Sequence, residues 1–344
     1  MSSRNQEQSS DWRVIGGSIQ GSAHIRECKP KQDQICWWPE PGEGLPLVLV
    51  VADGHGGESH FRSHIGASFA VKTAIDVLVK FAERTKNEAD LKLAKQRAEQ
   101  ELPKVIYNGW QIAIADELCT NPLTQEELAL VEKLRGAARR RHVTLHPVLA
   151  YGTTLLSVLI TDKYILYLQL GDGDILVVDE KDEVRKAISP NEELLGDEVF
   201  SLSLSNAWKD FSVSFESLAR DDLPALILMS TDGYHNSFVD EDAFLRVGID
   251  YHRMIREKGI DAVAAQLEGW LSTTSARGSG DDISLGLVCR TDTLPKPIDK
   301  AVTEKVEVTN ISTSAEKDED TVETRQASEI ARPDPADNTK RQNE

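Results

Sequence analysis

The feature that most constrains this chain is a set of short apolar segments that end at, or turn on, an Asp-Gly pair. Three are Val51-Ala52-Asp53-Gly54, Leu170-Gly171-Asp172-Gly173 and Ser230-Thr231-Asp232-Gly233, and a further apolar segment begins just after Asp281-Asp282. Taken singly, each pair is most simply a turn, because Asp bonds nearby backbone and Gly accepts positive φ. Taken together, they predict buried strands that carry carboxylates at their ends.

Six apolar runs show the aliphatic and β-branched enrichment of strands. They are 47–52, 155–160, 164–170, 175–178, 225–229 and 283–288. Helical patterns lie between them at 65–83 and at 87–118, the second with a break at Pro103. A third begins at a capping box formed by Thr124 and Glu127 and ends at about Leu134, and a fourth runs from after 239 to about 271. Strands in two groups separated by helices favour an α+β layered fold over alternating βαβ units, and the strands of 155–178 predict an antiparallel meander.

Composition divides the 344 residues into three parts. Residues 12–290 contain no repeat and are expected to form one large domain, after a flexible N-terminus at 1–11. The segment 291–344 has no Phe, Trp or Tyr, contains four prolines and has more acidic than basic residues. Such a stretch buries too little apolar area to offset its ordering entropy, so we expect a disordered acidic tail, either merely solvated or acting as a tether.

The charge balance restricts the partners. The chain has 39 Lys and Arg against 57 Asp and Glu, a formal net charge of −18. Nucleic acid and anionic membranes are therefore excluded as expected partners, whereas a divalent cation suits grouped carboxylates. Four scattered cysteines indicate a reducing compartment, and the absence of a signal-like or 18-residue apolar stretch predicts a cytoplasmic location.

Carboxylates held at the ends of neighbouring strands would converge in one cleft, where their repulsion is costly unless cations neutralise it. Oxygen ligands of this kind select Mg²⁺ or Mn²⁺ over zinc. The richest cluster is Asp53-Gly54-His55-Gly56-Gly57. Its glycines let the backbone approach a ligand closely, and its His is suited to proton transfer near neutral pH.

An ordered set of motifs spanning about 12–290 resembles the type 2C (PPM) family of metal-dependent Ser/Thr protein phosphatases, in bacterial style. The motifs are Val51-Ala52-Asp53-Gly54-His55-Gly56-Gly57, Tyr151-Gly152-Thr153-Thr154-Leu155, Leu170-Gly171-Asp172, Ser230-Thr231-Asp232-Gly233 and Gly280-Asp281-Asp282-Ile283-Ser284. The resemblance implies a four-layer α-β-β-α sandwich with two central antiparallel sheets and a metal centre at one end.

The resemblance also implies a role for each site residue. Asp53 corresponds to the carboxylate that bridges two Mn²⁺ or Mg²⁺ ions, with the Gly54 carbonyl on one of them. Asp232 and Asp281 correspond to the other direct ligands, Asp281 being preferred to Asp282 because the family's ligand is the first of the pair. Two further positions follow the pattern: Asp33 holds the metals through water, and Asp172 contributes to a third metal site.

The implied reaction is two-metal hydrolysis of phosphoserine or phosphothreonine in proteins by a metal-bridging water, without a phosphoenzyme. His55 corresponds to the residue proposed to protonate the departing oxygen. The implied partners are a phosphoprotein substrate and an opposing Ser/Thr kinase. Two alternatives remain: a catalytically weak phosphoprotein-binding or scaffold module, and a small-molecule phosphatase on the same metal site.

The sequence departs from the family pattern at two positions. Many members have a phosphate-binding Arg where this chain has Cys28; the nearest candidates are Arg26 and His24, and we assign the role to Arg26. After Asp232 the pattern often has another Asp, and here Asn236 stands instead, which is a weaker ligand for the third metal.

Two other groups of residues have competing interpretations. His24, Cys28 and Cys36 have zinc-ligand chemistry but no fourth partner at the local spacing. The basic run Arg139 to His142, with His146 beyond, is either a solvated loop or a docking site for an acidic or phosphorylated segment. The helical region 84–148 is longer than the fold requires, so partner specificity is expected there.

Overall fold

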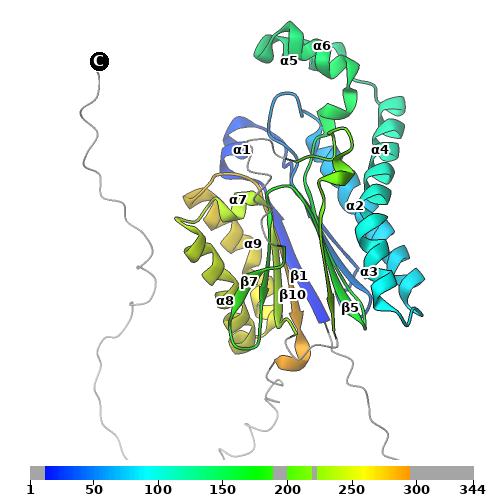
Figure 1. The fold of residues 1–344 in the computed structure, drawn as a ribbon. Helices are drawn as coiled ribbons and strands as arrows, with labels where there is room; N and C mark the ends of the chain where they lie inside the picture. Colours follow the sequence, from blue (N-terminus) through cyan, green and yellow to red (C-terminus); the bar gives the residue numbers. More distant parts are fainter. Residues whose placement is uncertain (1–11, 189–199, 219–222, 295–344) are drawn as a thin grey trace, which may run out of the picture. The chain divides into compact units, whose positions relative to one another are not determined.

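The computed structural model describes residues 12–188, 200–218 and 223–294, and the structural statements below concern these residues. Two five-stranded sheets lie face to face, and every strand pair is antiparallel (Figure 1). In order across the first sheet, the strands are β1 (Trp12–Ile19), β10 (Ile283–Arg290), β9 (Leu226–Ser230), β6 (Asp174–Val178) and β7 (Val184–Lys186). In order across the second, they are β2 (Gln34–Trp38), β3 (Leu47–Ala52), β4 (Leu155–Ile160), β5 (Tyr164–Leu170) and β8 (Ser212–Ser217).

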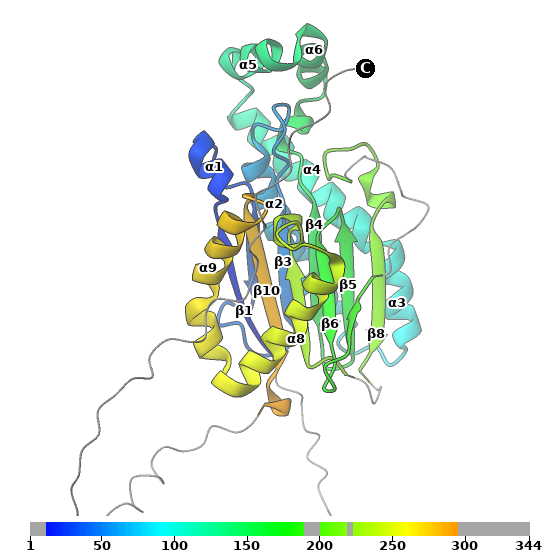
Figure 2. The ribbon, with the colours of Figure 1, turned by 90° about the vertical axis from the view of Figure 1, so that its left-hand side faces the viewer.

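Helices cover the outer face of each sheet (Figures 1 and 2). The first sheet is covered by α8 (Glu241–Lys258) and α9 (Ile260–Arg277), and the second by α2 (Ser63–Thr85), α3 (Leu91–Gln100) and α4 (Leu102–Thr120). This arrangement confirms the α+β, four-layer sandwich with two central antiparallel sheets. Within the described residues, no helix is both long and apolar enough to cross a membrane.

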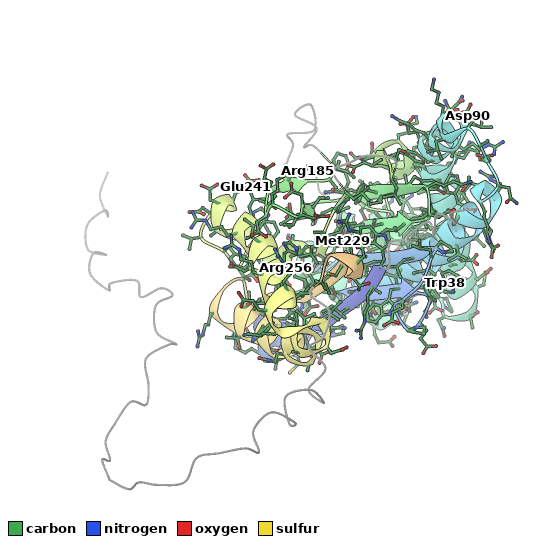
Figure 3. The ribbon with its side chains drawn as sticks, turned by 90° about the horizontal axis from the view of Figure 1, so that it is seen from below. Trp38, Asp90, Arg185, Met229, Glu241 and Arg256 are labelled. Carbon is green, nitrogen blue, oxygen red and sulfur yellow. The ribbon has the colours of Figure 1, made fainter. Side chains whose placement is uncertain are left out.

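Strand β3 shows why the apolar runs become central strands. All six of its side chains are buried, and they alternate between two cores. Val48, Val50 and Ala52 pack toward the helices of the second sheet, whereas Leu47, Leu49 and Val51 pack between the sheets. Because successive side chains point to opposite faces, a strand covered on both sides reads as a continuous apolar run. Figure 3 shows Met229, which is fully buried, in the interior between the layers.

The predicted strands are all present, but the predicted meander is wrong at its last strand. β4 pairs with β5, whereas β6 pairs with β9 and β7 in the other sheet. The chain changes sheets at Gly171, whose φ is +113° and where a Cβ would lie 2.5 Å from the Thr154 side chain. Glycine is the residue that satisfies both conditions. The Asp172-Gly173 pair that follows it therefore lies in a crossover between the layers rather than in a hairpin turn.

The helix predictions are confirmed in their main features. The break at Pro103 separates α3 from α4, and Thr124 and Glu127 form the expected capping box at the start of α5 (Gln125–Arg135). The basic run at 139–142 lies in α6 (Ala137–Leu145), so its interpretation as a loop is wrong. Arginines and alanines are good helix formers, which explains the helix.

Several short elements were not predicted because they lack continuous apolar runs. They are β1, β2, β7, β8, α1 (Ser22–Glu27), α7 (Asp232–His235) and the 3-10 helices η1 (Pro147–Tyr151), η3 (Ala207–Lys209) and η4 (Thr291–Thr293). The expected flexible N-terminus at 1–11 lies outside the described residues. So does the expected acidic tail, except for 291–294, where η4 follows β10.

Candidate metal centre

The strand register brings the predicted carboxylates to one edge of the two sheets. Asp53 follows the end of β3, which pairs with the start of β2, just after Asp33. Asp232 follows the end of β9, which pairs with the start of β10, just after Asp281. Asp172 follows the end of β5. Since the end of one antiparallel strand meets the start of its neighbour, all five side chains come to the same end of the sandwich.

The Gly-Thr-Thr motif fixes the backbone of Asp53. The Asp53 backbone N–H donates to Thr154 Oγ1 at 3.0 Å. The Asp53 carbonyl accepts from the Thr154 backbone N–H and from Thr153 Oγ1, both at 2.8 Å. Gly54 packs so closely that a Cβ would lie 2.8 Å from the Gln32 carbonyl oxygen. These contacts hold the backbone at the end of β3 in a fixed position.

Asp33 and Asp232 are positioned from opposite sheets. Asp33 is 1% exposed, and its Oδ2 accepts a 2.6 Å hydrogen bond from Thr231 Oγ1. Asp232 begins the short helix α7 and accepts a 3.0 Å bond at Oδ2 from Asn236 Nδ2. Asn236 therefore orients the Asp232 carboxylate instead of adding a carboxylate of its own.

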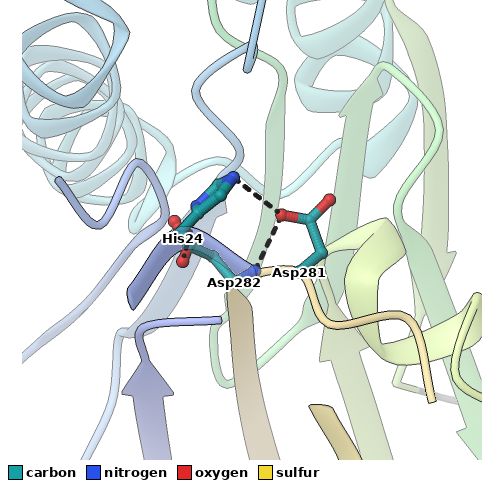
Figure 4. Close-up of side chains that lie close together, drawn as sticks. All are labelled: His24, Asp281 and Asp282. Carbon is teal, nitrogen blue, oxygen red and sulfur yellow. Dashed lines mark hydrogen bonds and ion pairs between the residues drawn. The ribbon is translucent and has the colours of Figure 1, made fainter. Parts of the chain in front are cut away.

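The paired Asp281 and Asp282 have different environments (Figure 4). Asp282 is 3% exposed and accepts 2.6 Å hydrogen bonds from the backbone N–H groups of Gly21 and Gln32. Its carboxylate therefore ties the N-terminal segment to β10. Asp281 is more exposed and accepts a 2.8 Å bond from the Asp282 N–H, which leaves oxygen lone pairs free for a ligand.

His24 from α1 lies beside both carboxylates, and sequence reasoning missed this contact. Its Nδ1 is 2.9 Å from Asp282 Oδ1, and its Nε2 is 3.5 Å from Asp281 Oδ1. Among the described residues, these three form a group whose geometry is compatible with a metal ion, and it includes neither Cys28 nor Cys36. The zinc interpretation of those cysteines gains no geometric support.

The electrostatics of the cluster favour bound cations. Burial and the neighbouring aspartates raise the pKa values of Asp33 and Asp53 well above the usual range, and burial also raises the pKa of Asp281. The charge of the nearby Asp232 adds to the shift in the pKa of Asp53. In the described part of the chain, no Lys or Arg forms an ion pair with these side chains. The donor atoms of these four aspartates are all oxygen, which fits Mg²⁺ or Mn²⁺.

Asp172 and Asp174 illustrate the difference between a candidate ligand and a structural carboxylate. Asp174 is 6% exposed, and it pairs with Lys186 Nζ at 3.2 Å and with His235 Nδ1 at 2.8 Å. Asp172 is exposed to solvent and has no such cation among the described residues. The surrounding protein and the charge of Asp232 raise the pKa of Asp172. Asp172 is thus placed at the rim of the centre, with a side chain that remains available.

His55 lies on the loop that follows Asp53. Its ring packs edge to face against His60, with the centroids 5.2 Å apart. Burial and the neighbouring His60 lower the pKa of His55 to about 4, so the imidazole is neutral at pH 7. The His60 ring is fixed by a 2.6 Å contact between Nδ1 and the Leu149 carbonyl oxygen.

Arg26 does not contact the carboxylates. It is exposed on α1, and its one hydrogen bond to a described residue is a 3.5 Å bond to Ser22 Oγ. Cys28 ends the same helix in a left-handed conformation with φ 54°. The helix brings His24 to the site from a position one turn before Cys28. The sequence did not indicate that His24 lies beside Asp281 and Asp282, because α1 is too short to show a helical pattern.

The fold is similar to that of several solved structures. One is the catalytic domain of PstP in complex with two manganese ions, with 15% sequence identity and a TM-score of 0.47 over 81% of this chain and 98% of that chain. A second is Stp1 from Staphylococcus aureus, with 14% identity and a TM-score of 0.47 over 84% of this chain and 99% of that chain. A third is PppA from Pseudomonas aeruginosa, with 18% identity and a TM-score of 0.45 over 81% of this chain and 97% of that chain. Curated sequences gave no significant match. The sequence profile of the family described as Protein phosphatase 2C matches residues 20–272, most of the chain. The chain therefore belongs to the protein phosphatase 2C family and is a protein phosphatase.

Proposed function

We propose that this protein uses two Mn²⁺ or Mg²⁺ ions to hydrolyse phosphoserine and phosphothreonine in proteins, and that it opposes a Ser/Thr kinase in the cytoplasm. One observation carries the proposal. Carboxylates from both sheets meet at one edge, with pKa values raised by burial and mutual repulsion and with no Lys or Arg partner among the described residues. Divalent cations would remove that repulsion.

The residues that would hold the ions are Asp53, the Gly54 carbonyl, Asp232 and Asp281, with Asp33 acting through water. Asp53 is the residue best placed to bridge, because both Asp33 and Asp232 lie beside it. Bound cations would supply an activated water nucleophile and offset charge on the phosphoryl oxygens. Asp172 at the rim is the candidate ligand for a third metal ion. That third site would be weaker, because the neutral amide of Asn236 adds no negative charge to it.

The protein's own groups would orient the phosphate ester and handle the proton. His55 is neutral at pH 7 in this structure, so it must take up a proton before it can give one to the departing Ser or Thr oxygen. A phosphate dianion bound beside the imidazole favours the charged form and raises its pKa. We therefore propose that substrate binding prepares His55 as the general acid. Arg26, exposed and without an acidic partner in the cluster, remains the proposed phosphate-binding cation.

Phosphate release distinguishes this function from its alternatives. The substrates are a phosphothreonine peptide, a phosphoserine peptide and p-nitrophenyl phosphate, each with Mn²⁺, Mg²⁺, Ca²⁺ or EDTA. The variants are Asp53→Ala and Asp232→Ala, and the matched control is Asp76→Ala, which removes an exposed carboxylate whose one ion-pair partner among the described residues is Lys80 on α2.

The proposal expects turnover of both peptides with Mn²⁺ or Mg²⁺, loss of turnover by several orders of magnitude in the two site variants, and full activity in Asp76→Ala. Turnover of p-nitrophenyl phosphate without peptide turnover would favour a small-molecule phosphatase. Absence of turnover with every metal, in folded protein, would refute the proposal and favour a binding module.

A further inference from the structure

The helices α5 and α6 form a hairpin beyond the strand ends, at the end of the molecule where α1 and α7 also lie (Figures 1 and 2). The hairpin is fastened to the loop that follows Asp53-Gly54-His55. Arg62, at the end of that loop, donates to both oxygens of Glu127 at 2.7 and 2.8 Å. Leu128, Val131 and Val143 form a small buried core of the hairpin, against which Phe61 packs. The hairpin is therefore fixed to the loop that leads away from the metal centre.

A pocket of about 390 Å³ lies between this loop and the hairpin. Its lining consists of Gly57, Glu58, Ser59, His60, Arg135 and Arg139. The volume falls within the range of small-ligand sites. His60 connects the pocket to the metal centre, because its ring touches that of His55 with centroids 5.2 Å apart.

The arginines of the pocket differ in their partners. Arg135 is neutralised by Glu58, since its Nε and Nη2 both lie 2.7 Å from Glu58 Oε2. Arg139 is only partly exposed and donates from Nε to Ser59 Oγ at 2.6 Å. Among the described residues it has no carboxylate partner, so both of its Nη groups remain available.

The pocket is thus positive in a protein of net charge −18. The charges of Arg135 and Glu58 cancel, which leaves that of Arg139. Burial, together with the nearby charge of Arg139, lowers the pKa of His60, so the imidazole remains neutral at pH 7. A planar guanidinium with two unused donors is suited to bind a carboxylate or a phosphate in a bidentate manner.

We propose that this pocket is a substrate-specificity subsite that binds a second anionic side chain, near the phosphorylated residue being hydrolysed, through Arg139. The substrate class is then a phosphopeptide segment with an acidic or phosphorylated residue beside the scissile phosphoresidue. This inference rests on the proposed function for its catalytic context. The loop between Asp53 and Arg62 would direct a bound segment from the metals past His55 and His60 into the pocket.

The first test measures kcat/KM for a series of phosphothreonine peptides that differ at one flanking position at a time, carrying Ala, Glu, phosphoserine or Arg there. At the best position, wild-type enzyme is expected to prefer the Glu or phosphoserine peptide to the Ala peptide by about tenfold or more, the worth of a charge-assisted hydrogen bond. Preference for phosphoserine over Glu, or the reverse, identifies which oxyanion the pocket selects.

Variants then assign the preference to one side chain. Arg139→Gln should abolish the ratio between the acidic and Ala peptides, and Arg139→Glu should shift the preference to the Arg peptide. Arg141→Gln is the matched control, because this substitution removes the same charge from the same helix. Arg141 is exposed and does not line the pocket. An equal change of the ratio in Arg141→Gln, or an unchanged ratio in Arg139→Gln, would overturn the proposal.

A second measurement is independent of catalysis. The Nε–H resonance of Arg139, assigned through Arg139→Gln, is followed by NMR in metal-free protein during titration with the non-hydrolysable Glu-flanked peptide that has Ala at the phosphosite. The subsite predicts a saturable shift that the Arg-flanked peptide does not produce. If the Glu-flanked peptide binds but the protein has no phosphatase activity, the proposed function is refuted and the subsite is retained. If the protein is active but shows neither the resonance shift nor the peptide preference, the subsite alone is refuted.

Discussion

Replacing Arg62 with Ala is expected to lower the free energy of unfolding by about 3 to 5 kcal/mol, the cost of breaking a buried ion pair by removing one partner. Arg62 is 8% exposed and donates five hydrogen bonds. Two go to Glu127, and the others reach the Asn121 carbonyl at 2.6 Å, the Pro122 carbonyl at 3.1 Å and the Tyr151 hydroxyl at 2.7 Å. Removal leaves a carboxylate that is 27% exposed, and two carbonyls, without these partners.

Urea unfolding at pH 7 with EDTA measures this cost. Lys80→Ala is the control, because Lys80 forms an exposed pair with Asp76 on the same helix, for which about 0.5 kcal/mol is expected. Arg62→Lys keeps the charge but loses the planar fork, so it should recover less than half of the loss. If Arg62→Ala costs no more than Lys80→Ala, Arg62 does not fasten the hairpin as described.

The pH dependence of the same difference tests its electrostatic part. Burial alone would raise the pKa of Glu127, but the hydrogen bonds from Arg62 and from Thr124 lower it overall below its ordinary value of 4.5. A carboxyl group with a lowered pKa stabilises the fold above its unfolded pKa, and this contribution is lost as the pH falls through the folded value. The difference between wild type and Arg62→Ala should therefore be constant from pH 8 to 5 and shrink below about pH 4. A difference that stays constant to pH 3 would assign the effect to packing alone.

Three further changes probe the site and its frame. Saturating Mn²⁺ should raise the melting temperature of wild type but not of Asp53→Ala, since a cation bound only by the folded state stabilises it by mass action; equal shifts would exclude Asp53 as a ligand. Asn236→Asp should lower the stability of metal-free protein by about 1 kcal/mol, because a hydrogen-bond donor to Asp232 is replaced by a like charge. The same substitution should enlarge the stabilisation by Mn²⁺, and thermal unfolding measures both effects. Gly66→Ala should cost more than about 2 kcal/mol in urea unfolding, because its Cβ would lie 1.9 Å from the Tyr151 carbonyl oxygen.

The sequence predicted the central strands and the edge at which the carboxylates meet, because both follow from local patterns. A strand covered on both faces, such as β3, reads as a continuous apolar run, and each Asp-Gly pair follows the end of such a run. The edge strands β2 and β8, whose residues are only partly buried, have no such run and escaped prediction. The chain crosses to the other sheet at Gly171, whose backbone passes close to the Thr154 side chain, and no local pattern records this approach.

The candidate site was predictable in its aspartates but not in their partners. Unlike Asp281, Asp282 accepts hydrogen bonds from backbone donors more than 200 positions away in sequence, and His24 reaches both from a single short helix. Among the described residues, Arg139 likewise has no carboxylate partner, whereas Arg140 on the same helix has one in Glu132. Such assignments require the tertiary packing, because neighbours in sequence face different surroundings.

Calorimetric titration of Mn²⁺ into metal-free protein tests the central claim most directly, since the claim is that the clustered aspartates exist to bind cations. We predict two Mn²⁺ ions per chain for wild type and for Asp76→Ala, and a loss of this binding in Asp53→Ala and Asp232→Ala. Absence of binding in folded wild-type protein, or binding that is undiminished in both site variants, would contradict the assignment of this edge as the metal centre.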